Sequence, residues 1–332
     1  MSDAARTYLS GIQPSGLLHL GNYFGAIERH VALQERPGRH YYFIADYHAL
    51  TTVHDAELLR RNVFETAVAY LALGLDPERA VLFRQSDVPE VTEIAWLLAC
   101  VTGMGLLERA HSYKDKVARG IKPSVGLFTY PVLMAADILA YDSELVPVGR
   151  DQVQHVEMTQ DMATRFNETF GSRVFVRPEM LMPETAAARK VPGLDGQKMS
   201  KSYGNDLWIF ESGKKLRKRV NRIVTDSRPP EEPKDPDELF LFDLLALFLP
   251  PDELEGLRDA VRRGGPGAPG YGDLKARLAE AIEERFAPAR ARREELLAHP
   301  ERVEEVLSAG GAEARRKATE VRDRAYRACG LR

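Results

Sequence analysis

The feature that most constrains the fold is the alternation of strand-like and helix-like segments through the first two-thirds of the chain. Short apolar runs bounded by polar residues are typical of buried strands, whereas apolar residues repeated every three or four positions are typical of helices. The segments expected to be strands are 8–13, 41–45, 80–83 and 145–148, and those expected to be helices are 23–34, 59–71, 91–100 and 152–166. This order predicts a parallel sheet with helices on its faces, and therefore an α/β fold.

The composition changes near residue 206. A basic helical stretch at 214–222 is followed by a proline-rich linker at 228–236, and no strand pattern is convincing after Ile209. Helical runs are expected at 238–248, 273–298 and from about 312 to 329. We therefore expect an α/β domain over residues 1–205 and a C-terminal helical domain over residues 206–332, with the last helix packing back on the first domain.

Composition excludes several classes of protein. The 332 residues carry a formal net charge of -3, which argues against a protein that coats nucleic acid non-specifically. The two cysteines, Cys100 and Cys329, form no disulfide framework and have no metal-ligand spacing, as is typical of the reducing cytoplasm. We expect no secretory signal and no membrane association, because the longest apolar stretch, 94–107, is shorter than the ~20 residues that a membrane span needs.

The first motif that carries chemistry is His19-Leu20-Gly21-Asn22, which follows a strand and a Pro-Ser-Gly turn and opens a helix. Unpaired N–H groups at the start of a helix favour phosphate. Gly21 has no Cβ and lets a nucleotide approach the backbone, while His19 and Asn22 can donate to phosphate oxygens on one side. The alternative is a helix cap with a surface histidine.

The second motif is Lys198-Met199-Ser200-Lys201-Ser202, flanked by glycines at 193, 196 and 204. Average residue usage gives an unrelated chain of this length a probability on the order of one in ten thousand of containing this pentapeptide. Two lysines on a glycine-flanked loop suit a triphosphate whose charge moves toward a departing pyrophosphate. The alternative is a solvated basic loop.

These two motifs, in this order on an α/β chain, resemble those of the class I aminoacyl-tRNA synthetases. The resemblance implies a Rossmann-like catalytic domain in which both motifs bind ATP, with Mg²⁺ held mainly by the phosphates and no metal held by the protein. Asn22 stands where the full signature has histidine, a variation found in the branch specific for tryptophan and tyrosine.

Further segments are similar to bacterial tryptophanyl-tRNA synthetases over nearly the whole chain. They are 10–16, 46–49, 129–139, 146–152, 192–197 and 303–311. The resemblance implies that tryptophan and ATP give tryptophanyl-adenylate and pyrophosphate, and that tryptophan is then transferred to the 3′ end of tRNA(Trp). It also implies a cytoplasmic homodimer whose helical domain reads the anticodon.

The amino-acid pocket is expected on one helix face carrying Tyr130, Met134, Asp137 and Tyr141. A carboxylate among apolar neighbours is costly unless a group donates to it, and the indole of tryptophan offers one N–H on a large apolar body. A phenol also donates, so the residues alone leave tyrosine open. The resemblance assigns Asp137 to the indole nitrogen.

The resemblance also implies the remaining site residues. Expected tryptophan contacts are Leu9, His48, Tyr130, Met134, Asp137 and Gln152. Expected ATP contacts are Gln13, Pro14, Ser15, Gly21, Asn22, Gly149, Arg150, Asp151, Val191, Lys198, Met199, Ser200, Lys201 and Ser202. His19, Asn22, Lys116, Lys198 and Lys201 are expected to act in catalysis.

Two positions depart from the family pattern, because Leu9 replaces an aromatic residue and Arg150 often corresponds to glutamate. Three other functions stay open. The chain could be a tyrosyl-tRNA synthetase, a nucleotidylyltransferase, or a synthetase-like protein that binds tRNA or a partner without catalysis. For the basic segments 214–222 and 315–327, the alternatives are a tRNA surface and solvated helix faces.

Overall fold

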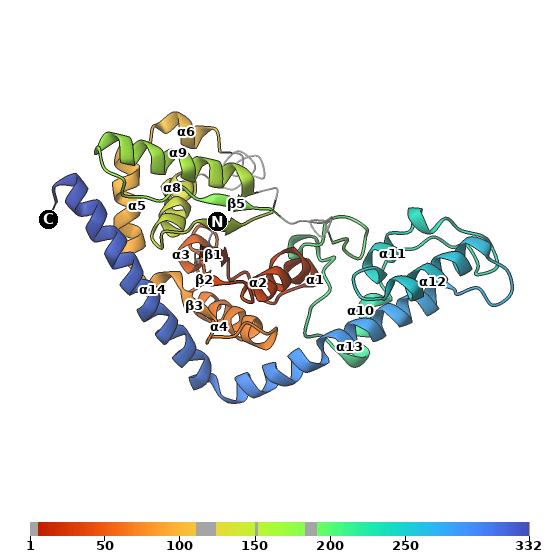
Figure 1. The fold of residues 1–332 in the computed structure, drawn as a ribbon. Helices are drawn as coiled ribbons and strands as arrows, with labels where there is room; N and C mark the ends of the chain where they lie inside the picture. The colour runs from red at the N-terminus through yellow and green to blue at the C-terminus, as the bar shows by residue number, and fades with distance from the viewer. Residues whose placement is uncertain (1–5, 111–123, 150–151, 183–190, 332) are drawn as a thin grey trace. The chain divides into compact units, whose positions relative to one another are not determined.

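A parallel sheet forms the centre of the fold, as the sequence predicted (Figure 1). The structure, a computed structural model, describes residues 6–110, 124–149, 152–182 and 191–331. The sheet has five strands in the order β3-β2-β1-β4-β5. Their bounds are β1 Arg6–Ile12, β2 Gly38–Ile44, β3 Ala80–Arg84, β4 Leu145–Pro147 and β5 Glu179–Leu181. The sequence analysis missed β5, because three residues are too few for a recognisable pattern.

The strand order reverses between β1 and β4. The chain runs outward from β1 through β2 to β3, and then crosses to place β4 on the other side of β1. In open parallel sheets, ligands bind at such a point of reversal, beside the carboxyl ends of the strands. The topology therefore places a binding crevice beyond Ile12 and Pro147.

The described residues fall into two compact units. The first contains the sheet and draws on segments 1–16, 29–188 and 296–332, while the second draws on 17–28 and 189–295. The expected functional division, with a catalytic domain over residues 1–205 and a tRNA-binding domain over residues 206–332, stays a prediction. Among the described residues, no helix is long and apolar enough to cross a membrane.

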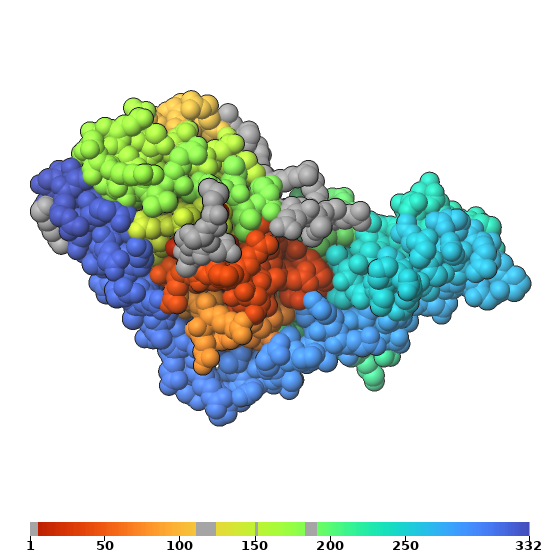
Figure 2. All heavy atoms as spheres, in the orientation of Figure 1, coloured from red at the N-terminus to blue at the C-terminus, as the bar shows by residue number. Residues whose placement is uncertain are grey.

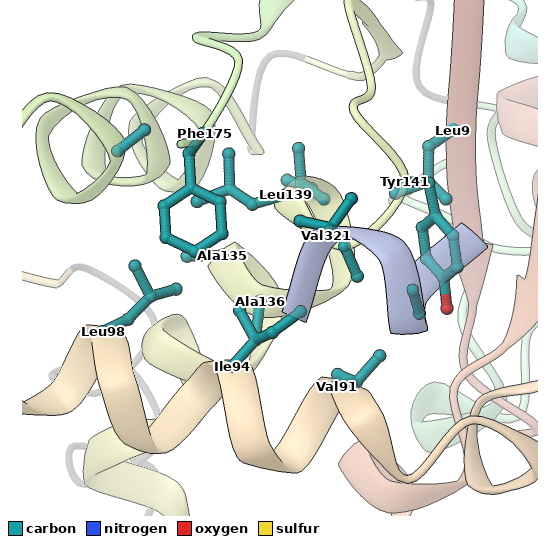
Figure 3. Packing of buried hydrophobic residues seen from close by; sticks show 14 of the residues in the cluster. Leu9, Val91, Ile94, Leu98, Ala135, Ala136, Leu139, Tyr141, Phe175 and Val321 are labelled. Carbon is teal, nitrogen blue, oxygen red and sulfur yellow. The ribbon is translucent and has the colours of Figure 1, made fainter. Parts of the chain in front are cut away.

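The first unit surrounds the sheet with helices. They are α2 Glu28–Leu33, which begins at the boundary between the units, and α3 Asp46–Ala49, α4 Ala56–Ala72, η2 Gln85–Asp87, α5 Glu90–Val101, α6 Met104–Glu108, α8 Val125–Leu139, α9 Val153–Thr169 and α14 Pro300–Cys329. Figure 3 shows Val91, Ile94 and Leu98 of α5 facing Ala135, Ala136 and Leu139 of α8. This apolar layer holds α8, which carries the expected amino-acid site, in a fixed position.

The second unit is mostly helical. Its elements are α1 Leu20–Asn22, the π-helical turn η1 Tyr23–Ile27, η5 Lys201–Tyr203, α10 Gly213–Val220, η6 Pro236–Glu238, α11 Phe240–Leu245, α12 Pro251–Arg263 and α13 Tyr271–Ala298, which belongs to this unit up to Glu295. The predicted helix 23–34 is therefore wrong as one regular element, because a π-helical turn interrupts it. The sequence analysis did not identify α12.

Helix α14 begins at Pro300, and the predicted start near residue 312 is wrong. Two adjacent glycines, Gly310 and Gly311, normally disfavour helix, but here Gly310 lies buried against β3 and Gly311 against η2. A Cβ at Gly310 would overlap the carbonyl oxygen of Leu82, and one at Gly311 would come within 2.9 Å of Asp87 Cβ. The glycines therefore let α14 pack closely along the edge strand β3.

The last part of α14 packs against other helices of the first unit. Val321 reaches the same apolar layer as α5 and α8. Figure 2 shows the end of α14, in blue, bordering the green surface of α9 and the residues after it. Arg324 Nε donates to the Val174 carbonyl at 2.9 Å, which joins these segments.

We expect Gly310→Ala to lower the free energy of unfolding by about 2 kcal/mol, because overpacking a tight contact outweighs the higher helix propensity of alanine. The matched control is Gly256→Ala in α12, where a Cβ meets nothing within 4 Å. We expect the control to raise the free energy of unfolding by up to about 1 kcal/mol. Urea unfolding measures both, and stabilisation by Gly310→Ala would contradict the close packing of α14 on β3.

Candidate active site

Polar side chains follow the carboxyl ends of several strands of the first unit. Gln13 comes directly after β1, His48 lies in α3 after β2, and Gln85 comes directly after β3. Gly149 follows β4, and Gln152 occupies the cap position of α9. Gln13 and Ser15 are exposed, whereas Pro14 is buried. Three predicted site residues, Lys116, Arg150 and Asp151, lie outside the described residues.

Asp137 lies in the last turn of α8, is 1% exposed, and contacts two of these side chains. His48 Nε2 lies 2.8 Å from Asp137 Oδ2, and Gln85 Nε2 donates to Oδ1 and Oδ2 at 2.7 and 2.9 Å. Burial raises the pKa of Asp137, while the hydrogen bond and charge of His48, followed by the hydrogen bond of Gln85, lower it. Two residues that were predicted separately as tryptophan contacts, His48 and Asp137, are therefore in direct contact.

Gln85 is a site residue that the sequence analysis missed. Its Oε1 accepts from the backbone N–H groups of Tyr47 and His48 at 3.0 and 3.4 Å. Because the oxygen is used there, the amide N–H₂ must face Asp137. The signal that could have identified Gln85 is its position, directly after the carboxyl end of a strand.

A small cavity of about 200 Å³ lies between α3 and α8, and its lining includes His48, the partner of Asp137. His48, Thr51, Tyr130 and Leu133 are among the residues that line it. The rings of His48 and Tyr130 lie edge to face, with centroids 6.1 Å apart. A cavity lined by aromatic and aliphatic side chains together with hydroxyl groups and a histidine is typical of a site for a small ligand.

Other predicted tryptophan contacts have different surroundings. Leu9 is fully buried in the core of the first unit, and Met134 is half-buried against the same core. Tyr141 lies beyond the end of α8, so the prediction that it shares the helix with Asp137 is wrong; it stacks on Tyr41 with centroids 5.1 Å apart. The Tyr130 hydroxyl forms a hydrogen bond with Nε2 of His155, a buried residue that the sequence analysis also missed.

The second unit carries the His19 motif. His19 is buried, and its Nδ1 has no hydrogen-bond partner among the described residues. Burial lowers the pKa of His19 to about 4, with Lys201 and Lys198 lowering it further and Asp206 opposing them. The ring is therefore neutral at pH 7, with one nitrogen as a donor and the other as an acceptor.

Asn22 and Gly21 fix the position of His19. Asn22 Oδ1 accepts the backbone N–H of His19 at 3.0 Å, so its amide nitrogen can donate to a ligand. A Cβ at Gly21 would lie 2.9 Å from His19 Nδ1, so glycine is needed there to leave room for the imidazole ring.

The predicted lysine loop, residues 198–202, lies in the same unit as His19. Lys198 and Ser202 are exposed and Lys201 is half-buried. Burial lowers the pKa of Lys201 to about 8, and the charge of Asp206 opposes this shift. Buried Met199 anchors the loop, because its N–H donates to the carbonyl of Val191 at 3.0 Å.

Asn205, which the sequence analysis missed, ties this loop together. Its Oδ1 accepts from Ser200 N–H at 2.8 Å, and its Nδ2 donates to the Lys198 carbonyl at 3.3 Å and to Asp195 Oδ1 at 2.7 Å. A Cβ at Gly193 would overlap Asn205. The flanking glycine thus allows a close approach that sets the shape of the loop.

Comparison with known proteins identifies the family of this chain. The family model described as tRNA synthetases class I (W and Y) matches residues 1–287. The chain is 56% identical to the tryptophan–tRNA ligase of Rhodopirellula baltica, over 98% of this chain and 99% of that protein. It is 51% identical to the tryptophan–tRNA ligase of Fusobacterium nucleatum, over 97% of each chain.

Solved structures give the same result. Tryptophanyl-tRNA synthetase from Campylobacter jejuni, crystallised with ADP and tryptophan, matches with a TM-score of 0.90 and 47% identity over 98% of this chain and 100% of that chain. The chain therefore belongs to the class I tRNA synthetases of the tryptophan and tyrosine group. The relatives of high identity described above are all specific for tryptophan by name.

We expect Gln85→Leu to destabilise the fold more at pH 7 than at pH 4.5. The pKa of Asp137 in the folded protein lies above its value of about 3.9 in the unfolded chain. The free energy of unfolding therefore falls as the pH rises from the unfolded pKa to the folded pKa. Removing the Gln85 donor raises that pKa further. A loss of about 3 kcal/mol at pH 7 is expected from breaking a buried bond to a charged group.

The control is Gln160→Leu, which removes a half-buried glutamine that donates to the Pro178 carbonyl at 2.8 Å. Its loss is expected to be about 1 kcal/mol and independent of pH. Urea unfolding at several pH values gives both series. Equal pH dependence in the two variants would contradict an ionised Asp137 held by Gln85.

Proposed function

We propose that this chain is a tryptophan–tRNA ligase that activates tryptophan with ATP and transfers it to tRNA(Trp). The observation that carries the proposal is the buried carboxylate of Asp137, held by Gln85 and by His48, which lines a cavity together with Tyr47 and Tyr130. High identity to tryptophan–tRNA ligases over nearly the full chain supports the same substrate.

The indole N–H is the group that Asp137 recognises. A carboxylate has about four lone-pair sites, and the protein donors at Asp137 are one nitrogen of His48 and one of Gln85. One further donor from an otherwise apolar ring completes the set. Tyr130, Met134, Leu9 and Gln152 are proposed to shape the rest of the tryptophan site.

ATP is proposed to bind through both signature motifs. His19 and Asn22 donate to phosphate oxygens, and Lys198 and Lys201 neutralise the departing pyrophosphate. Mg²⁺ is proposed, from the resemblance, to be held mainly by the phosphates. When bound there, Mg²⁺ supplies further charge neutralisation.

Other nucleotide contacts are proposed from the resemblance. Gln13, Pro14 and Ser15 follow β1 and Gly149 follows β4, at the point where the strand order reverses. Val191, Gly21 and residues 198–202 supply the contacts of the second unit. The roles of Lys116, Arg150 and Asp151 stay predictions.

Catalysis then consists mostly of positioning tryptophan and ATP relative to each other. The carboxylate of tryptophan is ionised at neutral pH, so it attacks the α-phosphorus of ATP without a general base. The bond between the α-phosphorus and the bridging oxygen breaks, and pyrophosphate leaves. In the second step, the 2′-hydroxyl of the terminal adenosine of the tRNA attacks the tryptophanyl carbonyl, and AMP leaves.

The tRNA is proposed to contact the exposed basic face of α10, formed by Lys214, Lys215, Arg217 and Lys218. The second basic segment, 315–327, is different, because several of its cations pair with acidic groups of the first unit. Arg315 pairs with Glu90 at 2.9 Å and Lys317 pairs with Asp142 at 2.7 Å. We therefore favour α10 as the tRNA surface.

The resemblance supports three further proposals. The enzyme is a homodimer, it works in the cytoplasm, and residues 206–332 include the part that reads the anticodon. Light scattering at micromolar concentration would test the first of these, and a mass equal to one chain of 37.2 kDa would contradict it.

ATP–pyrophosphate exchange tests the central proposal, with tryptophan and tyrosine offered separately. We expect exchange with tryptophan only. Lys201→Ala should lower kcat about 100-fold with little change in tryptophan affinity, because the lysine acts on the leaving group. Lys214→Ala is the control and should exchange normally. Exchange with tyrosine would overturn the substrate, and absence of exchange with either would favour a binding protein.

The double variant Lys214→Glu/Lys215→Glu should raise KM for tRNA in aminoacylation about tenfold or more, because each reversal adds repulsion from phosphates. Pyrophosphate exchange should stay unchanged, since it needs no tRNA. Arg60→Glu/Arg61→Glu makes the same charge change on exposed positions of α4 and serves as the control. Equal effects of both double variants would contradict a specific role for α10.

A further inference from the structure

The two cysteines of the chain lie on two helices that pack against each other. Cys100 is in the last turn of α5 and Cys329 is the last residue of α14. These helices share the apolar core of the first unit, and they lie side by side in Figure 1. Neither the proposed reaction nor the apolar layer requires a thiol at these positions.

Side-chain bonds between the helices define their register. The Glu90 carboxylate accepts from the hydroxyl of Thr319 at 3.3 Å, and Arg322 donates to Glu93 at 2.8 Å. Both pairs are 229 residues apart in the chain, so the two helices run parallel with a constant offset. The same offset pairs Cys100 with Cys329.

Helical geometry extends this register from Glu93 to Cys100. Seven residues are close to two turns, so Cys100 lies on the same face of α5 as Glu93, and Cys329 lies on the same face of α14 as Arg322. Both helices rise by the same distance per residue, and the offset is therefore kept over these two turns. The two thiols are thus brought to the same level of the helix pair.

The electrostatics of the thiols agrees with this placement. Burial raises the pKa of Cys329, and the negative charge of a Cys100 thiolate raises it further. A charge on one thiol acts on another only when the two are close. Cys100 is exposed and Cys329 is half-buried, so Cys100 is the thiol that a reagent meets first.

We propose that Cys100 and Cys329 form a redox-modification site, in which a reversible intramolecular disulfide ties the end of α14 to α5. The oxidant is a low-molecular-weight disulfide. The Cys100 thiolate attacks one of its sulfurs and releases one small thiol, which gives a mixed disulfide. The Cys329 thiolate then attacks the Cys100 sulfur and releases the second small thiol. Two protein thiols are oxidised and one small disulfide is reduced.

The cross-link would act on the stability of the first unit. α14 packs along β3 through Gly310 and joins α5 through the pairs of Glu90 and Glu93. Tying its end to α5 restrains the unfolded chain and prevents separation of the two helices. We expect oxidation to raise the thermal midpoint by about 5 °C.

The test uses the full chain incubated with oxidised glutathione. Thiol titration should fall from two thiols to none, peptide mapping should find residues 100 and 329 in one cross-linked peptide, and dithiothreitol should reverse both changes. Cys100→Ser and Cys329→Ser should each end as a glutathione adduct with no gain in thermal midpoint. Cys329→Ala replaces Cys329→Ser if the serine variant fails to fold.

Two results would overturn the proposal. One is a wild-type protein that carries glutathione on both cysteines without an internal cross-link. The other is a covalent dimer joined through Cys100 of two copies. Both are read from the wild-type protein by mass spectrometry, so they do not depend on how the variants fold.

Discussion

The site in the first unit depends on a single buried carboxylate. Asp137 is costly to bury as an anion, and it is tolerated because His48 and Gln85 donate to it. Both donors lie just after parallel strands, so the sheet itself brings them to α8. The packing of α5, α8 and α14 in one apolar layer keeps these strand ends and α8 together. Core packing and the proposed recognition of the substrate are therefore linked.

The second unit differs from the first, because its predicted ATP site carries an excess of positive charge. Burial lowers the pKa of His19 to about 4, with Lys201 and Lys198 lowering it further, and burial lowers the pKa of Lys201 to about 8. A bound anion such as triphosphate would stabilise the charged form of these groups. Asn205 and Gly193 set the shape of the loop that carries these lysines. The loop is therefore held in a defined shape by contacts within the protein.

The sequence predicted the parallel sheet, because it follows from short-range patterns, and the family, because its motifs carry a resemblance that the comparisons confirm. It named His48 and Asp137 as separate site residues, but their direct contact is visible only in the structure. Gln85 and Asn205 were missed, since their roles depend on which distant groups the fold brings to them. The start of α14 was wrong for a related reason: Gly310 disfavours a helix locally, and only contact with β3 compensates for it.

The most direct test of this account is the binding of tryptophan compared with β-(3-benzothienyl)alanine, which has sulfur in place of the indole N–H and nearly the same shape. Isothermal titration calorimetry with the wild-type protein gives both dissociation constants. Recognition of the indole N–H by ionised Asp137 predicts that the analogue binds roughly 10- to 100-fold more weakly, the effect of losing a hydrogen bond to a charged group. Equal affinities would show that Asp137 does not select the substrate.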